Sequence, residues 1–210
     1  FGGGTPSLLP ANFLEQILQR LHDTFDTSKV KEITLEANPG EAPLEHLKDI
    51  RGLGVNRLSM GFQSFNDKIL KLLGRLHKSE DCFKTFKNAR KAGFDNINTD
   101  MIFNIPNQSL DVLNDNVNRV LKLEPEHISC YSLTVEKGTM LHYNVSNNIV
   151  KMPDEKLDQD MFLAITTKLG DAGYHQYEVS NYCKTNKECI HNLHYLNLDP
   201  YLAFGPSAHG

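Results

Sequence analysis

Residues Ile33-Thr34-Leu35-Glu36-Ala37-Asn38-Pro39-Gly40 are the stretch that decides the fold class. Apolar and polar side chains alternate over 33–37 with the period of a β-strand, and the Asn-Pro-Gly that follows breaks the chain. A helix is predicted to come next and to end at about Leu53. The stretch therefore predicts one β/α unit.

The same cycle recurs along the first two thirds of the chain. Further strands are predicted at 57–61, 96–103 and 127–135. Helices are predicted at 11–25, 79–92 and 110–121, and another follows the strand at 57–61 and ends at Leu72. Such alternation argues for parallel strands joined by right-handed crossovers, either in an open doubly wound sheet or in a complete or partial (β/α) barrel. Polar residues fall at the strand ends, and this favours the barrel.

The regular alternation of predicted strands and helices ends after Val135. Residues 136–153 are predicted to be rich in loops, and a predicted helix at 154–169 and a predicted strand at 174–180 follow them. The last residues, 205–210, predict a glycine-rich turn.

Length and composition fit one globular unit with an elaborated tail. The 210 residues include 40% hydrophobic side chains, which is enough to bury one substantial core. We expect an α/β fold in which residues 1–135 form a partial (β/α) barrel of the TIM type. Residues 136–210 are expected to form a C-terminal α+β extension.

Charge and hydropathy argue against two classes of partner. A net charge of -4 gives no clustered positive footprint for nucleic acid, and no apolar run approaches the length that spans a bilayer. The first residues have neither the basic region nor the apolar stretch of a signal peptide.

The 4 cysteines are too few and too scattered for a disulfide framework, which favours a reducing compartment. The expected location is the cytoplasm, or the mitochondrial matrix if a transit peptide has been removed.

Three successive glycines, Gly2-Gly3-Gly4, precede Thr5-Pro6. Backbone without Cβ atoms lets a ligand approach main-chain groups closely, so a binding loop is one interpretation. The loop lacks the Gly-Lys-Ser/Thr of a phosphate loop, and Ser7 stands where the last glycine of a dinucleotide fingerprint should be. The alternative interpretation is a tight turn without a ligand.

Glu36 and Asp100 are carboxylates at the ends of mainly apolar strands. A lone buried carboxylate is costly, so each needs a partner. Arg75 could supply one in a structural ion-pair network. Alternatively, all three side chains could contact a zwitterionic ligand, with the carboxylates accepting from an ammonium or from ribose hydroxyls and the guanidinium binding a carboxylate.

A series of blocks along the chain resembles one family. The blocks are Phe1–Ser7, Leu35–Gly40, Asn56–Phe65, Gly74–His77, Asp100 with Ile105–Gln108, Ile128–Leu133, Tyr177–Asn181 and His191–Tyr195. In order and spacing they are similar to the radical SAM family of oxygen-independent coproporphyrinogen III oxidases and HemW heme chaperones, over nearly the whole chain. The resemblance implies that the partial barrel is of the radical SAM type.

The resemblance also implies a site for S-adenosylmethionine (SAM). The positions that correspond to the family's SAM-binding residues are Gly3, Gly4, Thr5, Glu36, Gln63, Arg75, Asp100 and Thr134. The glycine loop would bind the amino group of SAM, and the other side chains would surround its ribose and methionyl parts. A [4Fe-4S] cluster would cleave SAM reductively to a 5′-deoxyadenosyl radical. Its Cys-x3-Cys-x2-Cys ligands are expected upstream of Phe1, because no cysteine of the chain has that spacing.

Three blocks resemble the chaperone branch more than the oxidase branch, which implies heme as a further ligand. His191 would be the axial ligand of the heme iron, and Asn192 and Tyr195 would supply hydrogen-bonding and stacking groups beside the porphyrin. In one departure from the family, Leu196 replaces the Trp that usually follows the Tyr.

A second departure is that Asn104 and Asn107 replace glycines near Asp100. Without the resemblance, Cys183 and Cys189 together with His191 and His194 could suggest zinc, although their spacing matches no standard site.

Three functions remain open at this point. The favoured one is a chaperone that binds SAM and heme and transfers heme to acceptor proteins. The second is an oxygen-independent coproporphyrinogen III oxidase, and the third is a SAM- or heme-binding module without catalysis. The partners expected are heme or another porphyrin and heme-acceptor proteins.

Overall fold

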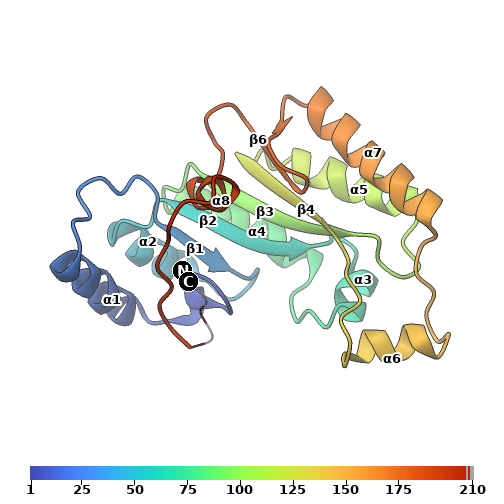
Figure 1. Cartoon of the computed structure of the whole chain (residues 1–210), viewed down its shortest axis with the longest axis horizontal. Helices are drawn as coiled ribbons and strands as arrows, with labels where there is room; N and C mark the ends of the chain where they lie inside the picture. Colours follow the sequence, from blue (N-terminus) through green and yellow to red (C-terminus); the bar gives the residue numbers. More distant parts are fainter. Residues whose placement is uncertain (207, 209–210) are drawn as a thin grey trace.

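A six-stranded mixed sheet forms the centre of the fold (Figure 1). In the computed structural model, which describes residues 1–206 and 208, the strand order is β1-β2-β3-β4-β6-β5. The strands are β1 Thr34–Ala37, β2 Arg57–Gln63, β3 Ile97–Phe103, β4 His127–Ser132, β5 His175–Gln176 and β6 Asn181–Cys183. The first four are parallel, and β6 runs antiparallel to both β4 and β5.

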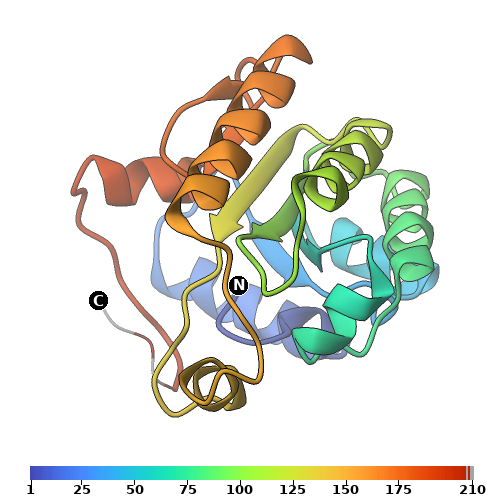
Figure 2. The ribbon, with the colours of Figure 1, turned by 90° about the vertical axis from the view of Figure 1, so that its right-hand side faces the viewer.

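Helices connect the parallel strands on one side of the sheet. They are α2 (Leu44–Gly52), α3 (Asp67–Leu72), α4 (Ser79–Lys91) and α5 (Leu110–Leu121). Figure 2 shows α4 and α5 on one side of the strands and α8 (Ile190–Leu196) on the other. The remaining elements are η1 (Pro6–Leu8), α1 (Ala11–Thr24), α6 (Met140–Ser146) and α7 (Glu155–Asp171), of which α7 packs on α5. The predicted α/β fold with a partial barrel is thereby confirmed.

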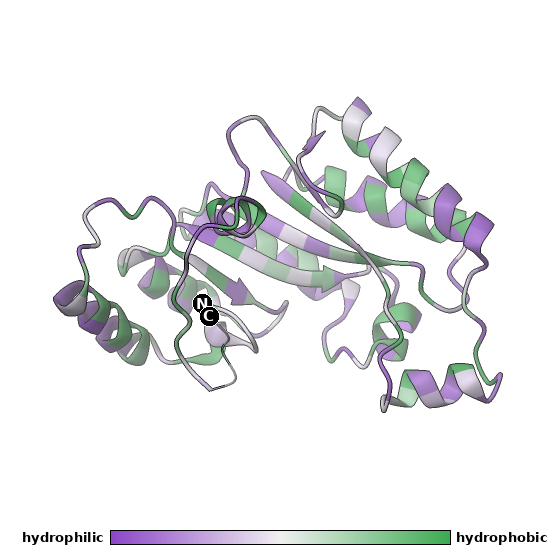
Figure 3. Cartoon of the chain, viewed as in Figure 1, coloured by the Kyte–Doolittle hydropathy of each residue, from purple (hydrophilic) through white to green (hydrophobic). Residues whose placement is uncertain are grey.

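Side chains alternate between two faces along the parallel strands. In β2, Leu58 and Met60 are fully buried in the apolar core, whereas Arg57 and Ser59 line a cavity on the other face. Figure 3 shows hydrophobic and hydrophilic residues alternating along the strands. Parallel sheets with helices on both faces are apolar on both. The polar face therefore marks the inner side of the partial barrel.

The predicted strand at 174–180 is wrong in its bounds. The structure instead has a hairpin there, in which β5 and β6 pair antiparallel. Between them the N–H of Ser180 donates to the Glu178 carboxylate at 2.8 Å. A local side chain thus takes the backbone donor that a continuous strand would use in its ladder.

The sequence pattern also misses two helices, α6, within the stretch predicted to be loop-rich, and α8. Neither helix contains a buried residue, so the apolar periodicity that reveals a helix is weak in both. The start of α6 has a local cause, because Oγ1 of Thr139 accepts from the N–H of His142 at 3.1 Å.

Two further expectations concern the described part of the chain. No helix within it has the length and apolar character needed to cross a membrane. The turn predicted at 205–210 includes Ser207, His209 and Gly210, which lie outside the described residues.

The loop after β3 explains the two asparagines that stand where the family resemblance leads us to expect glycine. Asn104 has φ 59° and Asn107 has φ 61°, both in the left-handed region. Asparagine is one of the few residues with a side chain that enter this region readily. Asparagine can therefore replace glycine here without a change of backbone conformation.

We predict that Asn107→Val lowers the free energy of unfolding by about 1 to 2 kcal/mol, because a β-branched side chain is strained at positive φ. Asn107→Gly is the matched control and should cause no loss. Urea unfolding followed by circular dichroism measures both. Equal stability of the two variants would show that the left-handed conformation is not retained in solution.

Candidate functional site

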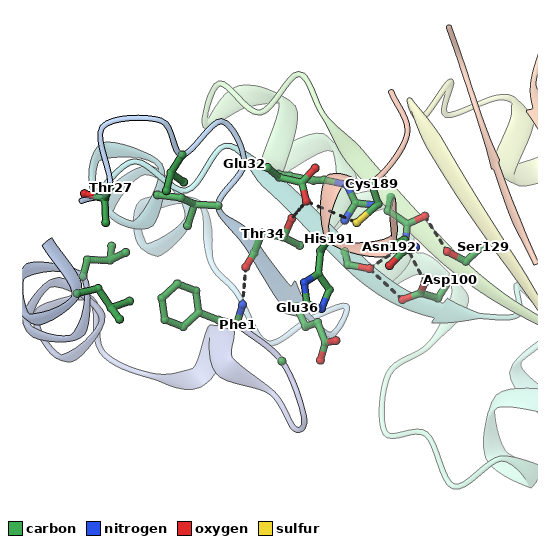
Figure 4. Close-up of a pocket in the computed structure, with 18 of the residues that line it drawn as sticks. Phe1, Thr27, Glu32, Thr34, Glu36, Asp100, Ser129, Cys189, His191 and Asn192 are labelled. Carbon is green, nitrogen blue, oxygen red and sulfur yellow. Dashed lines mark hydrogen bonds between the residues drawn. The ribbon is translucent and has the colours of Figure 1, made fainter. Parts of the chain in front are cut away.

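The polar face of the sheet forms one wall of a cavity of about 580 Å³ (Figure 4). The strand residues in this wall include Glu36, Arg57, Ser59, Asn98, Asp100 and Ser129. The beginning of the chain contributes Gly2, and α8 contributes His191 and Asn192. Carboxylate, amide, hydroxyl and imidazole groups from distant parts of the sequence therefore meet in one place.

The first residue runs alongside the outer strand of the sheet. The nitrogen of Phe1 donates to the carbonyl of Thr34 at 2.7 Å, and its carbonyl accepts from the N–H of Glu36 at 3.0 Å. These two bonds place the glycine loop at the carboxyl end of β1.

The glycine loop contacts Glu36 directly. The N–H of Gly3, whose φ is 82°, donates to Oε2 of Glu36 at 3.2 Å. A Cβ atom on Gly2 would lie 2.6 Å from Oε1 of the same carboxylate. A side chain at position 2 would therefore displace the Glu36 carboxylate, and glycine is favoured at position 3 by backbone conformation. Oγ1 of Thr5 accepts from Nδ2 of Asn38 at 2.9 Å, which ties the loop to the turn after β1.

Asp100 is held by the polar side chains around it. Its Oδ1 accepts from Nδ2 of Asn98 at 2.8 Å, and its Oδ2 accepts from Oγ of Ser59 at 3.3 Å. Burial raises the pKa of Asp100 above its ordinary value, although these hydrogen bonds and the positive charge of Arg57 lower it. Desolvation is therefore the dominant effect on this carboxyl group.

Glu36 and Asp100 influence each other across the cavity. Desolvation raises the pKa of Glu36, the hydrogen bond from Gly3 lowers it, and the negative charge of Asp100 raises it further. Two like charges in one site resist joint ionisation. A bound cation such as an ammonium group would stabilise both ionised carboxylates.

A chain of hydrogen bonds runs from Asp100 to α8. Nδ2 of Asn98 donates to Asp100, so Oδ1 of Asn98 is the acceptor that faces Nδ1 of His127 at 2.6 Å. Nε2 of His127 lies 2.8 Å from the hydroxyl of Tyr177, which accepts from Nδ2 of Asn192 at 3.1 Å. Burial lowers the pKa of His127 to about 2. The ring is therefore neutral, with its hydrogen on Nδ1, and Nε2 accepts the hydroxyl hydrogen of Tyr177.

Helix α8 brings two of the candidate heme residues, His191 and Asn192, to the cavity, and Tyr195 lies outside its lining. Oε2 of Glu32 accepts from the N–H of Ile190 at 3.1 Å and thereby holds the first turn of α8. The exposed His191 ring lines the cavity and packs edge-on against Tyr195, with ring centroids 4.8 Å apart. Desolvation and the nearby positive charge of the N-terminus lower the pKa of His191, which favours the neutral imidazole that can ligate a metal.

Of the predicted SAM set, Glu36 and Asp100 line this cavity, whereas Gly3, Gly4, Thr5, Gln63, Arg75 and Thr134 lie outside its lining. Gln63 ends β2, is buried and has φ 64°. Arg75 is half-buried after α3, Thr134 is exposed after β4, and Gly4 is exposed in the first loop. Among the described residues, Arg75 forms no ion pair with Glu36, and it forms none with Asp100. The ion-pair network considered from sequence is therefore not formed, because Arg75 lies in a loop beyond the strands.

The cysteines are free and lie on different elements: Cys82 in α4, Cys130 in β4, Cys183 in β6 and Cys189 just before α8. A four-iron cluster requires thiolates in one array, and this arrangement does not fit it. The zinc set considered from sequence is also not assembled. Sγ of Cys183 instead lies 3.4 Å from Nε2 of His175.

Sequence reasoning overlooks the polar residues at the beginnings of the strands. Arg57 and His127 are the first residues of β2 and β4, and Asn98 is the second residue of β3. A signal exists for Arg57 and His127, since polar and apolar residues alternate along β2 and β4, whereas β3 has three polar residues in a row. A search limited to the carboxyl ends of the strands does not find the residues at their beginnings.

Comparison with known proteins assigns the chain to a superfamily. The sequence profile of the Radical SAM superfamily matches residues 1–120. The chain belongs to the radical SAM superfamily.

Relatives of this radical SAM chain carry more specific names. It is 38% identical over 210 residues to the "Heme chaperone HemW" of Bacillus subtilis, covering 100% of the chain and 55% of that protein. It is 36% identical over 210 residues to the mitochondrial "Radical S-adenosyl methionine domain-containing protein 1" of Danio rerio, covering 100% of the chain and 47% of that protein. The chain thus spans about half the length of these relatives.

A solved structure supports the same fold. Coproporphyrinogen III oxidase (HemN) from Escherichia coli, described as a radical SAM enzyme, superimposes with a TM-score of 0.75 at 27% identity. The match covers 89% of this chain and 43% of that protein.

We predict that Asp100→Asn makes the protein more stable at neutral pH and removes a pH dependence. Because the pKa of Asp100 is raised in the folded state, stability falls as pH rises from the unfolded pKa to the folded pKa. Below the unfolded pKa the parent and the variant should be equally stable. Urea unfolding at a series of pH values tests this, and a variant less stable than the parent at neutral pH would contradict it.

Proposed function

We propose that the chain is part of a radical SAM heme chaperone, which binds SAM and heme and passes heme to acceptor proteins. The observation that carries this proposal is that His191, the candidate heme ligand, lines the same cavity as Glu36 and Asp100. The names of the relatives that match the whole chain support it. Those relatives are bacterial and mitochondrial, in line with a location in the cytoplasm or the mitochondrial matrix.

The residues of the cavity suit the groups of SAM. The glycine loop leaves backbone open to a ligand, and two carboxylates face a zwitterion that carries an ammonium and a sulfonium. In this proposal Gly3, Gly4 and Thr5 bind the amino end, and Glu36 and Asp100 bind the amino group and the ribose. Gln63 and Thr134, near the ends of β2 and β4, and Arg75, in the loop after α3, would complete the site.

The superfamily also implies a [4Fe-4S] cluster, which when bound supplies the electron for SAM cleavage. The cysteines of this chain do not fit its ligand array, so its ligands would come from another segment. The chain's own part is to orient SAM and to limit access of water. The boundary between a barrel core at 1–135 and an extension at 136–210 is part of the same proposal.

Heme would bind at α8. The neutral imidazole of His191 is a suitable axial ligand, and Tyr195 offers an aromatic ring edge-on to it. Asn192 is already bonded to Tyr177, so its role would be to hold the helix beside the porphyrin. Leu196 is exposed where the family usually has Trp, which reduces the aromatic surface available to the ligand.

A second candidate function is oxygen-independent coproporphyrinogen III oxidase, favoured by the superposition on HemN. A third is a module that binds SAM or heme without catalysis. We expect the intact protein to leave coproporphyrinogen III unconverted in an anaerobic assay with SAM and reductant. Formation of protoporphyrinogen IX would establish the oxidase instead.

For SAM, we predict that Glu36→Gln in the intact protein weakens binding roughly ten- to a hundredfold, because a charge-assisted hydrogen bond is worth about 1.5 to 3 kcal/mol. Arg75→Ala should act in the same direction. Glu45→Gln is the matched control, since Glu45 pairs with Lys48 on the surface of α2. Isothermal titration calorimetry measures all three variants. Unchanged affinity in a folded Glu36→Gln variant would remove Glu36 from the site.

For heme, we predict a saturable site that His191→Ala largely abolishes. His194→Ala should retain it, because Nδ1 of His194 is bonded to Asp199 at 2.8 Å. A titration followed by the Soret band compares the two variants. Equal heme affinity in the parent and in His191→Ala would show that another group is the iron ligand.

A further inference from the structure

Three side chains that commonly ligate metals converge outside the cavity, at the β5–β6 hairpin. His175 lies in β5, Cys183 ends β6, and Glu188 lies in the loop that leads to α8. Their ligand atoms all lie within 4.8 Å of one another. We refer to these residues as the His-Cys-Glu cluster.

One ring nitrogen is shared by the other two members of the cluster. Nε2 of His175 lies 2.7 Å from Oε1 of Glu188 and 3.4 Å from Sγ of Cys183. This nitrogen carries at most one hydrogen, so a single N–H cannot be directed at both atoms. A metal ion can accept a lone pair from all three atoms at once. The convergence is therefore better satisfied by a cation than by a proton.

The distances from Nε2 of His175 to the other two ligand atoms are near those of a tetrahedral zinc site. Bonds of about 2.0 to 2.1 Å to nitrogen and oxygen and about 2.3 Å to sulfur separate neighbouring ligand atoms by roughly 3.3 to 3.6 Å. The His175–Cys183 distance of 3.4 Å already fits this range. The His175–Glu188 distance of 2.7 Å requires a small outward shift of two side chains that are 44% and 29% exposed.

The donor types select the metal. A thiolate, an imidazole and a carboxylate together suit zinc, whereas calcium and magnesium prefer oxygen ligands. Zinc binding would displace the thiol proton of Cys183, and the thiolate and the Glu188 carboxylate would then balance the two positive charges. Three protein ligands leave a fourth position, which water can occupy from the exposed side.

We propose that His175, Cys183 and Glu188 bind a zinc ion. The bound ion would join the hairpin to the loop before α8. Because α8 carries His191 and Asn192, zinc would fix the orientation of these residues relative to the cavity. The proposal is independent of the heme and SAM assignments, since none of its three ligands belongs to them.

The test is zinc retention by the intact protein. After exposure to zinc and dialysis, metal analysis should give one equivalent of zinc per chain, which Cys183→Ala and His175→Gln should reduce toward zero. Cys189→Ala is the matched control, because it removes another buried thiol of the same segment that lies outside the cluster. Circular dichroism checks that each variant is folded.

X-ray absorption at the zinc edge tests the ligand set in the parent protein without any variant. We expect one sulfur at about 2.3 Å together with nitrogen and oxygen at about 2.0 to 2.1 Å. Three results would overturn the proposal: no zinc retained by the folded parent, a zinc spectrum without sulfur, or equal zinc in the parent and Cys183→Ala. Either of the last two results would mean that the cluster is a His175–Glu188 ion pair beside a buried Cys183 thiol that binds no metal.

Discussion

The hydrogen-bond chain from Asp100 to Asn192 is the constraint on which the candidate site depends. It lies on the inner face of the sheet, where an unpaired polar group is costly. Burial and the nearby Arg57 keep His127 neutral, and only the neutral ring can donate to Asn98 while accepting from Tyr177. The position of Asp100 and the position of α8 are thus set by the same buried imidazole.

The contacts around these hydrogen bonds also explain how residues far apart in the sequence form one cavity. The pairing of β6 with β4 extends the sheet into the C-terminal segment, and Oγ of Ser129 donates to Oδ1 of Asn181 at 2.7 Å across that pairing. Glu32, which also lines the cavity, accepts from the N–H of Ile190 in the first turn of α8. The C-terminal segment is joined to the barrel strands through specific polar contacts, which define orientation more narrowly than apolar packing does.

The sequence predicted those parts of the fold whose physical signal is local. Helices such as α1 and α5 bury one face, and the parallel strands alternate between core and cavity, so periodicity reveals them. Helices α6 and α8 bury no residue, and the hairpin at 174–183 depends on a turn that the Glu178 side chain makes. The expectation of polar residues at strand ends indicated Glu36 and Asp100, although Asp100 lies in the middle of β3 and not at its end. The roles of His127 and Tyr177 depend on tertiary contacts that no spacing encodes.

The charged groups of the cavity indicate what kind of ligand would reduce their desolvation penalty. Arg57 is buried, and among the described residues its Nε has no hydrogen-bond partner. Glu36 and Asp100 both have raised pKa values, because desolvation opposes their ionised forms. A buried guanidinium with an unpaired Nε, near two carboxylates whose ionised forms are disfavoured, is a pattern common where function competes with stability. A zwitterion such as the proposed SAM carries an ammonium for the carboxylates and a carboxylate for a guanidinium, so it can offset both penalties, which a purely cationic or purely anionic ligand cannot do.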